Sequence, residues 1–205
     1  MARWEPDARG RLERAALELY AEQGFDQTTV AEIAQRAGLT RRSFFNHFAD
    51  KPEVLFWGHQ VLQEVYENSI AGAPESTSPV DVLATALQAA AALHEPRPDL
   101  IRRRHVVIAA HPTLQEREHL KRATVADTIT SALRRRGVDE PTATLLGGIG
   151  PAIFKIAYDR WVGDDTYDGR LGELVADAMA LLREVAGPAR APAVPPGPEA
   201  GRTRA

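Results

Sequence analysis

The stretch from Thr28 to Lys51, TTVAEIAQRAGLTRRSFFNHFADK, decides the fold of this chain. Thr29 and Glu32 have the spacing of a capping box, which predicts the start of a helix. Gly38 predicts its end, because glycine adopts the left-handed backbone conformation at little cost. Thr40 predicts the cap of a second short helix. Two short helices joined by a glycine turn indicate a helix-turn-helix, whose second helix enters the major groove of DNA.

Polar and basic side chains are concentrated on the second short helix and around it. Arginine can bind guanine through two hydrogen bonds and asparagine can bind adenine in the same way, so Arg41, Arg42 and Asn46 are the predicted base readers. Helix starts and cationic side chains bind phosphate. A solvated helix face is the alternative for such polar residues. The full predicted DNA-contact set is Thr28, Thr29, Thr40, Arg41, Arg42, Ser43, Phe45, Asn46, His47 and Lys51.

The bulk composition limits where nucleic acid can bind. The chain has 205 residues and a net charge of -3, so a DNA site must be a local basic patch. It has no cysteine, which excludes disulfides and thiolate metal ligands. The sequence has no signal-peptide pattern and no apolar run of the roughly 20 residues that a membrane helix needs. We therefore expect a cytoplasmic protein without a membrane segment.

The remaining chain predicts an all-α fold of about nine helices, because strand patterns are nearly absent. Residues 1–51 are the expected helix-turn-helix domain, and 52–186 are the expected helical ligand-binding and dimerisation domain. A helix is predicted from Pro52 to about Ala71. The proline-rich residues 187–205 are expected to be disordered. The GGIG segment, residues 147–150, indicates close helix packing, since no strand precedes it and no phosphate-binding lysine follows.

The order of these features resembles the TetR family of bacterial transcription regulators over about residues 9 to 57. The resemblance implies a homodimer, a ligand pocket in the C-terminal domain, and a four-helix interface from the last two helices of each subunit, about residues 141–162 and 171–185. One residue departs from the family pattern: Phe45 stands where members usually carry tyrosine. We therefore expect only an apolar contact from Phe45, for example with a thymine methyl group.

The C-terminal half is similar to the subgroup named for acyl-CoA-like ligands and typified by the mycofactocin-system regulator. The similar segments are Arg102 to Leu133 and Ala152 to Trp161. The run from Arg102 to His105 is a candidate anion site, with a solvated helix face as the alternative. No catalytic residue, cofactor or metal site is predicted; EREH, residues 116–119, has the wrong order for a zinc protease. The predicted ligand contacts are Trp57, Val61, Arg102, His105, Ile108, Phe154 and Trp161.

Together these features predict a homodimeric repressor that binds a pseudo-palindromic double-stranded DNA operator and is released by a small-molecule effector, with an acyl-CoA-like molecule as the candidate. Two alternatives stay open. A constitutive regulator or an activator without ligand response would have the same motifs. A helical enzyme carrying a helix-turn-helix is disfavoured, because the sequence lacks a cysteine nucleophile, a nucleophile elbow and a metal-spaced cluster.

Overall fold

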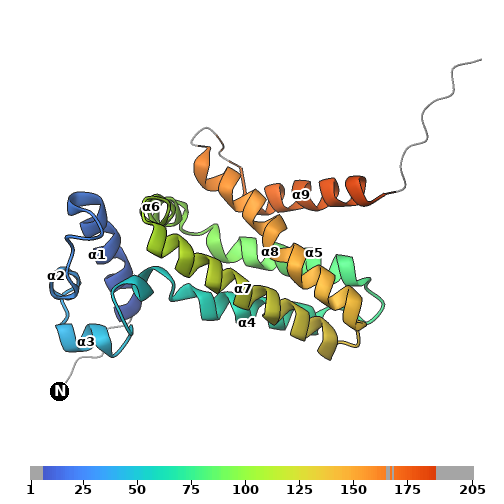
Figure 1. The fold of residues 1–205 in the computed structure, drawn as a ribbon, viewed down its shortest axis with the longest axis horizontal. Coiled ribbons are helices and arrows are strands. Elements are labelled where there is room, and N and C mark those ends of the chain that lie inside the picture. The colour runs from blue at the N-terminus through green and yellow to red at the C-terminus, as the bar shows by residue number, and fades with distance from the viewer. Residues whose placement is uncertain (1–6, 165–166, 168, 188–205) are drawn as a thin grey trace, which may run out of the picture.

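The structure is a computed structural model, and it describes residues 7–164, 167 and 169–187. Over these residues the chain is all-helical, with nine α-helices and one short 3-10 helix, as the sequence predicted (Figure 1). The predicted disorder of the tail concerns residue 187 onward and, apart from Gly187, lies outside the described residues. In chain order the elements are α1 Ala8–Gln23, α2 Val30–Arg36, α3 Arg41–Phe45, η1 Pro52–Leu55, α4 Gly58–Gly72, α5 Pro79–His94, α6 Pro98–Ala109, α7 Pro112–Arg135, α8 Glu140–Gly163 and α9 Leu171–Ala186.

Local signals position the helix-turn-helix. Thr29 caps α2 by accepting from the backbone N–H of Glu32 at 3.3 Å, and the Glu32 carboxylate accepts from the Thr29 N–H at 2.7 Å. This is the predicted capping box. Gly38 has φ of +68°, the left-handed conformation that ends α2. Thr40 caps α3 by accepting from the Ser43 N–H at 3.0 Å. Side-chain caps and one glycine therefore determine the orientation of α3 relative to α2.

The helix predicted from Pro52 is interrupted. Residues 52–55 form η1, and α4 begins only at Gly58. The backbone of Phe56 has φ −120° and ψ 3°, which breaks the helical path. Val54, Leu55 and Phe56 are all buried, at 0%, 3% and 3% exposure. Successive residues of an α-helix point in different directions, so the break allows three consecutive side chains to enter one core. This joint connects the helix-turn-helix end of the molecule, α1 to α3, to its body, α4 to α9.

Two hydrophobic clusters fill the molecule. The first combines α1, α2, α3 and η1 with Val107, Ile108 and Leu114 from α6 and α7. The second lies among α4, α5, α7, α8 and α9, which pack side by side in the larger part of Figure 1. The first cluster therefore extends past residue 51 and includes side chains from the body. The division into domains at residues 51 and 52 stays a prediction.

Close packing of α8 depends on the predicted glycine contacts. A Cβ atom on Gly147 would lie 2.9 Å from the backbone oxygen of Ala126, in α7, and 1.9 Å from Oγ1 of Thr130. A Cβ atom on Gly150 would lie 3.0 Å from a methyl carbon of Leu83, in α5. These glycines let α8 approach its neighbours closely, so the interpretation of GGIG as a packing motif is confirmed.

Candidate DNA-binding helix and ligand cavity

The short helix α3 presents the predicted base readers to solvent. Arg41, Arg42 and Asn46 are exposed, while Phe44 is fully buried and anchors the helix in the first cluster. Phe45 is 47% exposed, and the Arg41 guanidinium lies 5.7 Å from the centre of its ring. A large exposed aromatic side chain beside two arginines suits a groove that offers both base edges and thymine methyl groups.

The remaining predicted contacts near α3 have partly structural roles. The hydroxyl groups of Thr40 and Ser43 lie 2.9 Å apart and are hydrogen-bonded to each other at the start of α3. Thr29 is exposed at the start of α2, where it forms the capping box with Glu32. His47 is half-buried beside Phe48. These residues surround α3 and remain candidates for phosphate contact.

Thr28 and Lys51 are placed differently from the prediction. Thr28 is 2% exposed, and its hydroxyl donates to the carbonyl oxygen of Gly24 at 2.8 Å. Lys51 Nζ donates to the carbonyl oxygens of Phe25 and Thr28 at 2.7 and 2.9 Å. Burial lowers the pKa of Lys51, with Asp26 opposing the shift. Both side chains bind the loop between α1 and α2, so the structure gives them a role in supporting the helix-turn-helix, and their contact with phosphate stays a prediction.

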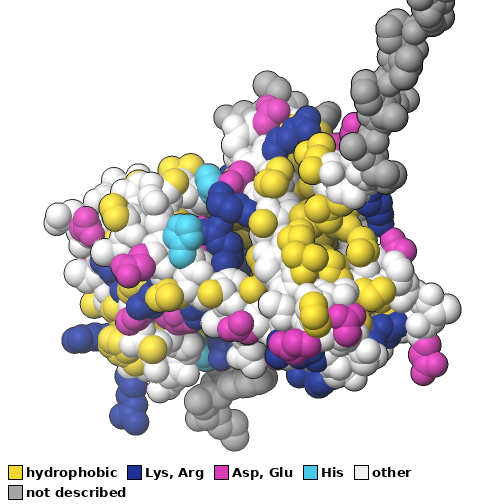
Figure 2. Space-filling view, turned by 45° about the vertical axis from the view of Figure 1, so that its right-hand side comes forward, with side chains coloured by type: hydrophobic (Ala, Val, Ile, Leu, Met, Phe, Trp, Pro, Cys, Tyr) yellow, Lys and Arg dark blue, Asp and Glu magenta, His cyan; other side chains and the backbone are white. Residues whose placement is uncertain are grey.

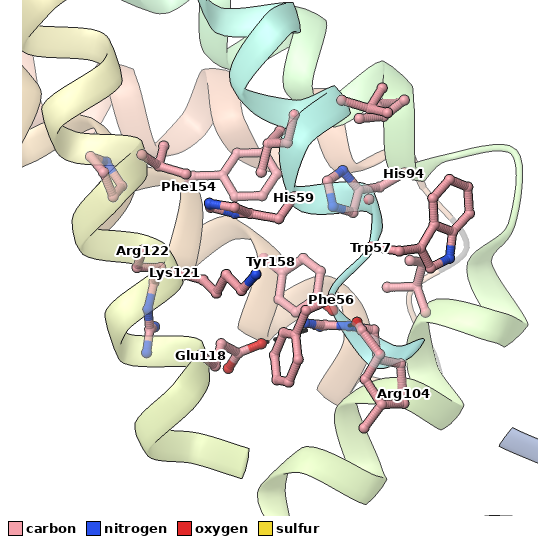
Figure 3. Close-up of a pocket in the computed structure, with 18 of the residues that line it drawn as sticks. Phe56, Trp57, His59, His94, Arg104, Glu118, Lys121, Arg122, Phe154 and Tyr158 are labelled. Carbon is pink, nitrogen blue, oxygen red and sulfur yellow. Dashed lines mark hydrogen bonds and ion pairs between the residues drawn. The ribbon is translucent and has the colours of Figure 1, made fainter. Parts of the chain in front are cut away.

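A cavity of about 210 Å³ lies in the body next to the η1–α4 joint. Its walls come from the joint and from α4, α5, α6, α7 and α8, and Figure 3 shows the side chains that point into it. The lining combines apolar side chains with charged side chains from α6, α7 and α8. The apolar members include Leu62, Tyr66, Ile101, Val125 and Phe154. The charged members include Arg104, Glu118, Lys121, Arg122, Lys155 and Asp159.

The structure brings together some of the predicted ligand contacts. Trp57, Val61 and Phe154 line the cavity. Four others do not line it, and their role as ligand contacts stays a prediction that the cavity does not support. Ile108 is buried in the first cluster, and Trp161 is buried in the second. Arg102 lies over the Trp161 ring and 4.0 Å from Asp99, and His105 lies behind Tyr158 with ring centres 6.1 Å apart.

Of the four residues from Arg102 to His105, Arg104 lines the cavity and the other three do not. Its Nε donates to the carbonyl oxygen of Leu55 at 2.6 Å, and its Nη1 donates to Glu118 at 3.1 Å. Its guanidinium lies 5.2 Å from the ring centre of Phe56. The spacing from the buried Ile101 favours Arg104 and His105 over Arg102, because residues three and four apart share a helix face, but it does not choose between those two.

Burial keeps the two cavity histidines neutral at pH 7. It lowers the pKa of His59 to about 4, and Lys121 adds to the shift. Burial also lowers the pKa of His94, whose Nδ1–H donates to the carbonyl oxygen of Ala90 at 2.8 Å. His59 Nε2–H donates to Thr124 Oγ1 at 2.7 Å, because the Thr124 hydroxyl already donates to the carbonyl of Lys121. The positive charge facing the cavity therefore comes from arginine and lysine.

Tyr158, at the centre of the cavity, has a hydroxyl group that lacks a good hydrogen-bond partner in the part of the chain that the structure describes. The hydroxyl oxygen of Tyr158 is buried and makes no hydrogen bond of ordinary geometry to the described residues. Burial raises its pKa, although nearby Arg104 opposes the shift. In Figure 3 the side chains of Lys121, Glu118 and Arg104 point toward Tyr158. A buried polar atom of this kind indicates a place for a ligand or a water molecule.

The last two helices expose large hydrophobic side chains. Leu145 and Ile156 of α8 are 60% and 61% exposed, and Leu181 and Val185 of α9 are 54% and 77% exposed. Figure 2 shows hydrophobic side chains gathered on the face where α8 and α9 lie. Contiguous apolar surface of this kind commonly marks a protein–protein interface.

Comparison with known sequences agrees with this arrangement. The family model described as "Bacterial regulatory proteins, tetR family" matches residues 13–56, and the model described as "MftR C-terminal domain" matches residues 77–187, more than half of the chain. The chain belongs to the TetR family. It is a DNA-binding transcription regulator with an MftR-type C-terminal domain, which sets aside the alternative of a helical enzyme.

Two regulators among the curated proteins are similar to this TetR-family chain in part. "HTH-type transcriptional regulator TcmR" of Streptomyces glaucescens is 35% identical over 81 residues, which are 40% of this chain and 36% of TcmR. "HTH-type transcriptional regulator HbdR" of Aromatoleum sp. (strain CIB) is 31% identical over 94 residues, which are 45% of this chain and 41% of HbdR. The alignments thus span well under half of either relative.

Solved structures match over most of the chain. Thermus thermophilus FadR, a TetR-family transcriptional repressor in complex with lauroyl-CoA, is 26% identical with a TM-score of 0.58, covering 91% of this chain and 98% of FadR. The fatty acid degradation regulator FadR of Bacillus halodurans is 18% identical with a TM-score of 0.56, covering 88% and 96%, and supports the fold alone. Within the described ranges, no helix has the length and hydropathy to cross a membrane.

Proposed function

We propose that this TetR-family regulator is a homodimeric repressor that leaves its operator when a small effector occupies the cavity between α4 and α8. The observation that carries the proposal is the position of the cavity. Its wall includes Leu55 and Phe56, which also belong to the hydrophobic cluster of the DNA-binding end. A ligand in the cavity therefore contacts the joint that orients α3.

The effector class follows from the lining and from one structural relative. The cavity lining combines apolar side chains with cationic ones, as an amphipathic anion requires. The Thermus thermophilus FadR structure, which covers nearly the same length of chain, contains lauroyl-CoA. An acyl-CoA or a related fatty acyl anion is the effector we propose.

The proposed dimer uses the exposed apolar faces of α8 and α9. Pairing these faces from two subunits removes Leu145, Ile156, Leu181 and Val185 from water. A two-fold dimer presents two copies of α3, so the operator is expected to be a pseudo-palindrome with half-sites about one helical turn apart. Effector binding favours a conformer with differently spaced copies of α3, which is a shift in population.

Footprinting of the region upstream of the protein's own coding sequence tests whether the dimer binds a pseudo-palindromic operator. We expect protection of an inverted repeat at low salt and a steep loss of affinity as salt rises, because Arg41 and Arg42 supply local positive charge. Protection of one half-site without its partner would contradict the dimer. A protein that protects the repeat equally with and without effector would favour the constitutive alternative.

A further inference from the structure

Arg104 contacts the cavity and the DNA-binding end at the same time. Its side chain lines the cavity, while its Nε donates to the carbonyl oxygen of Leu55 at 2.6 Å. Leu55 ends η1 and is 3% exposed in the first hydrophobic cluster. One guanidinium therefore connects the space for a ligand to the backbone of the joint.

A carboxylate holds Arg104 in this position. Glu118 accepts from Nη1 at 3.1 Å, and the two side chains are only 29% and 17% exposed. A guanidinium has five N–H donors, and these two bonds use two of them. The guanidinium points toward the buried hydroxyl of Tyr158, which lacks a hydrogen bond of ordinary geometry. The geometry thus leaves donors available at the polar end of the cavity.

The charge balance of the lining favours an anion. Five cationic side chains line the cavity against three carboxylates, which are Glu13, Glu118 and Asp159. Arg97 is paired with Glu13, Lys155 with Asp159 and Lys121 with Glu53, whereas Arg122 makes no ion pair with a described carboxylate. The lining therefore holds one cation, Arg122, that no described carboxylate neutralises. An anion that enters competes with Glu118 for Arg104, because guanidinium groups bind carboxylate and phosphate through paired hydrogen bonds.

We propose that Arg104 is the positioning residue that transmits occupancy of the cavity to the DNA-binding end: the anionic group of the ligand draws the guanidinium away from Glu118 and from the carbonyl of Leu55. This inference rests on the proposed function. The bond to Leu55 belongs to the conformer without ligand, and the bond to the ligand replaces it. Because the two conformers then differ in their affinity for the anion, the ligand shifts the equilibrium between them.

The test compares Arg104→Gln with Arg103→Gln, whose exposed side chain lies on the same helix but outside the cavity. Three probes of equal chain length are used: dodecanoate, lauroyl-CoA and the uncharged dodecanol. Probe affinity is measured by calorimetry, and operator affinity is measured by fluorescence anisotropy with and without each probe. Dodecanoate and lauroyl-CoA distinguish a carboxylate from CoA phosphates as the source of the anion.

We expect at least one anionic probe to weaken operator binding by wild type and Arg103→Gln by about tenfold or more. In Arg104→Gln the same probe should bind about tenfold more weakly, and its saturating effect on operator affinity should fall below about twofold. Dodecanol should bind both variants alike. A full release of Arg104→Gln at saturating anion would overturn the role of Arg104 while leaving the proposed function intact. A wild type that binds the operator and responds to no probe would contradict both proposals.

Glu118→Gln provides a second, independent test that does not require loss of the guanidinium. The substitution removes the competing carboxylate but keeps a side chain of the same size. We expect the anionic probe to bind several-fold more tightly to Glu118→Gln than to wild type, with no change for dodecanol. Unchanged or weaker binding of the anion would overturn the proposal even if Arg104→Gln failed to fold.

Discussion

Arg117 binds Asp50 through both terminal nitrogens of its guanidinium group, with Nη1–Oδ1 and Nη2–Oδ2 distances of 2.8 and 2.7 Å. The pair joins α7 to the loop between α3 and η1. Burial acts to raise the pKa of Asp50, but the hydrogen bonds from Arg117 and from the Glu53 N–H outweigh it and hold the pKa below its usual value. Lys121 adds a bond to Glu53 at 2.7 Å. Charged side chains of α7 thus bind the segment that connects α3 to η1 and the start of η1 itself.

Arg117→Gln should weaken operator binding more than it weakens the fold. The pair is partly exposed, at 33% and 43%, so its loss should cost about 1 kcal/mol of unfolding free energy or less. The orientation of α3 relative to the body becomes less restricted, and we expect operator affinity to fall about three- to tenfold. Urea denaturation and anisotropy with operator DNA measure the two effects.

Arg135→Gln is the matched control for that substitution. It breaks another exposed ion pair of α7, with Glu67 at 2.9 Å, but this pair connects α7 to α4 within the body. The control should lose no more than about twofold in operator affinity. An equal loss of operator affinity in both variants would show that the Arg117–Asp50 ion pair has no special role in DNA binding.

Base reading by α3 predicts a change of sequence preference. Arg42→Ala and Asn46→Ala should each reduce discrimination at one operator position by about 1–3 kcal/mol, because each removes a candidate bidentate contact. Competition binding against operators with single base changes measures the preference at every position. If Arg42→Ala weakened all operators equally, Arg42 would be a phosphate contact and would leave the set of base readers.

A charge in the apolar face of α8 should separate the proposed dimer. Ile156→Glu places a carboxylate on a side chain that is 61% exposed in the single subunit and buried in the proposed interface. Sedimentation should then show monomers, and operator affinity should fall at least about tenfold because two linked α3 helices bind more tightly than one. Leu120→Glu, at a position 65% exposed on α7, should remain dimeric. A dimeric Ile156→Glu variant would place the interface elsewhere.

The neutral state of His59 predicts an acid-sensitive fold. Its pKa lies near 4 in the folded protein against an ordinary value of 6.5, so between these pH values the unfolded chain binds a proton that the folded chain does not. Stability is therefore fully present above pH 6.5 and is lost as the pH falls toward 4. Between pH 7 and pH 5, His59 should account for about 1–2 kcal/mol of the loss, after allowance for solvent screening.

His59→Gln isolates this contribution, since glutamine can still donate to Thr124 Oγ1 but does not titrate in this range. Urea unfolding of both proteins at pH 7 and pH 5 gives the comparison. The variant should lose less stability than wild type over this interval, with the remaining loss coming partly from His94, whose pKa burial also lowers. Parallel losses in the two proteins would contradict a buried neutral His59.

The sequence predicts the features whose causes are local. The capping pair of Thr29 and Glu32 and the left-handed Gly38 depend on neighbouring residues, so the helix-turn-helix follows from spacing alone. The last two helices, predicted at 141–162 and 171–185, form at Glu140–Gly163 and Leu171–Ala186 because their apolar patterns are long and regular. The packing role of the α8 glycines can also be predicted from the sequence, because no strand precedes them and no phosphate-binding lysine follows.

Features that depend on distant contacts could not be predicted in the same way. Lysine is a residue type that commonly binds phosphate. The Nζ atom of Lys51 instead donates to the carbonyl oxygens of Phe25 and Thr28, more than twenty residues earlier in the chain. The choice of Arg104 over His105 depends on how α6 crosses the joint at Leu55. The break between η1 and α4 likewise depends on burial of Phe56 in a core that α6 and α7 help to complete. In each case tertiary contacts decide between assignments that are equivalent in sequence.

The most direct test of the account is a titration of lauroyl-CoA into a preformed complex of the wild-type protein with fluorescent operator DNA, followed by anisotropy. We predict that the anisotropy falls toward the value of free DNA at saturating lauroyl-CoA, with operator affinity reduced by about tenfold or more, while equal concentrations of free coenzyme A leave the complex intact. An operator complex that persists unchanged at saturating, calorimetrically verified lauroyl-CoA binding would contradict release by an effector in the cavity.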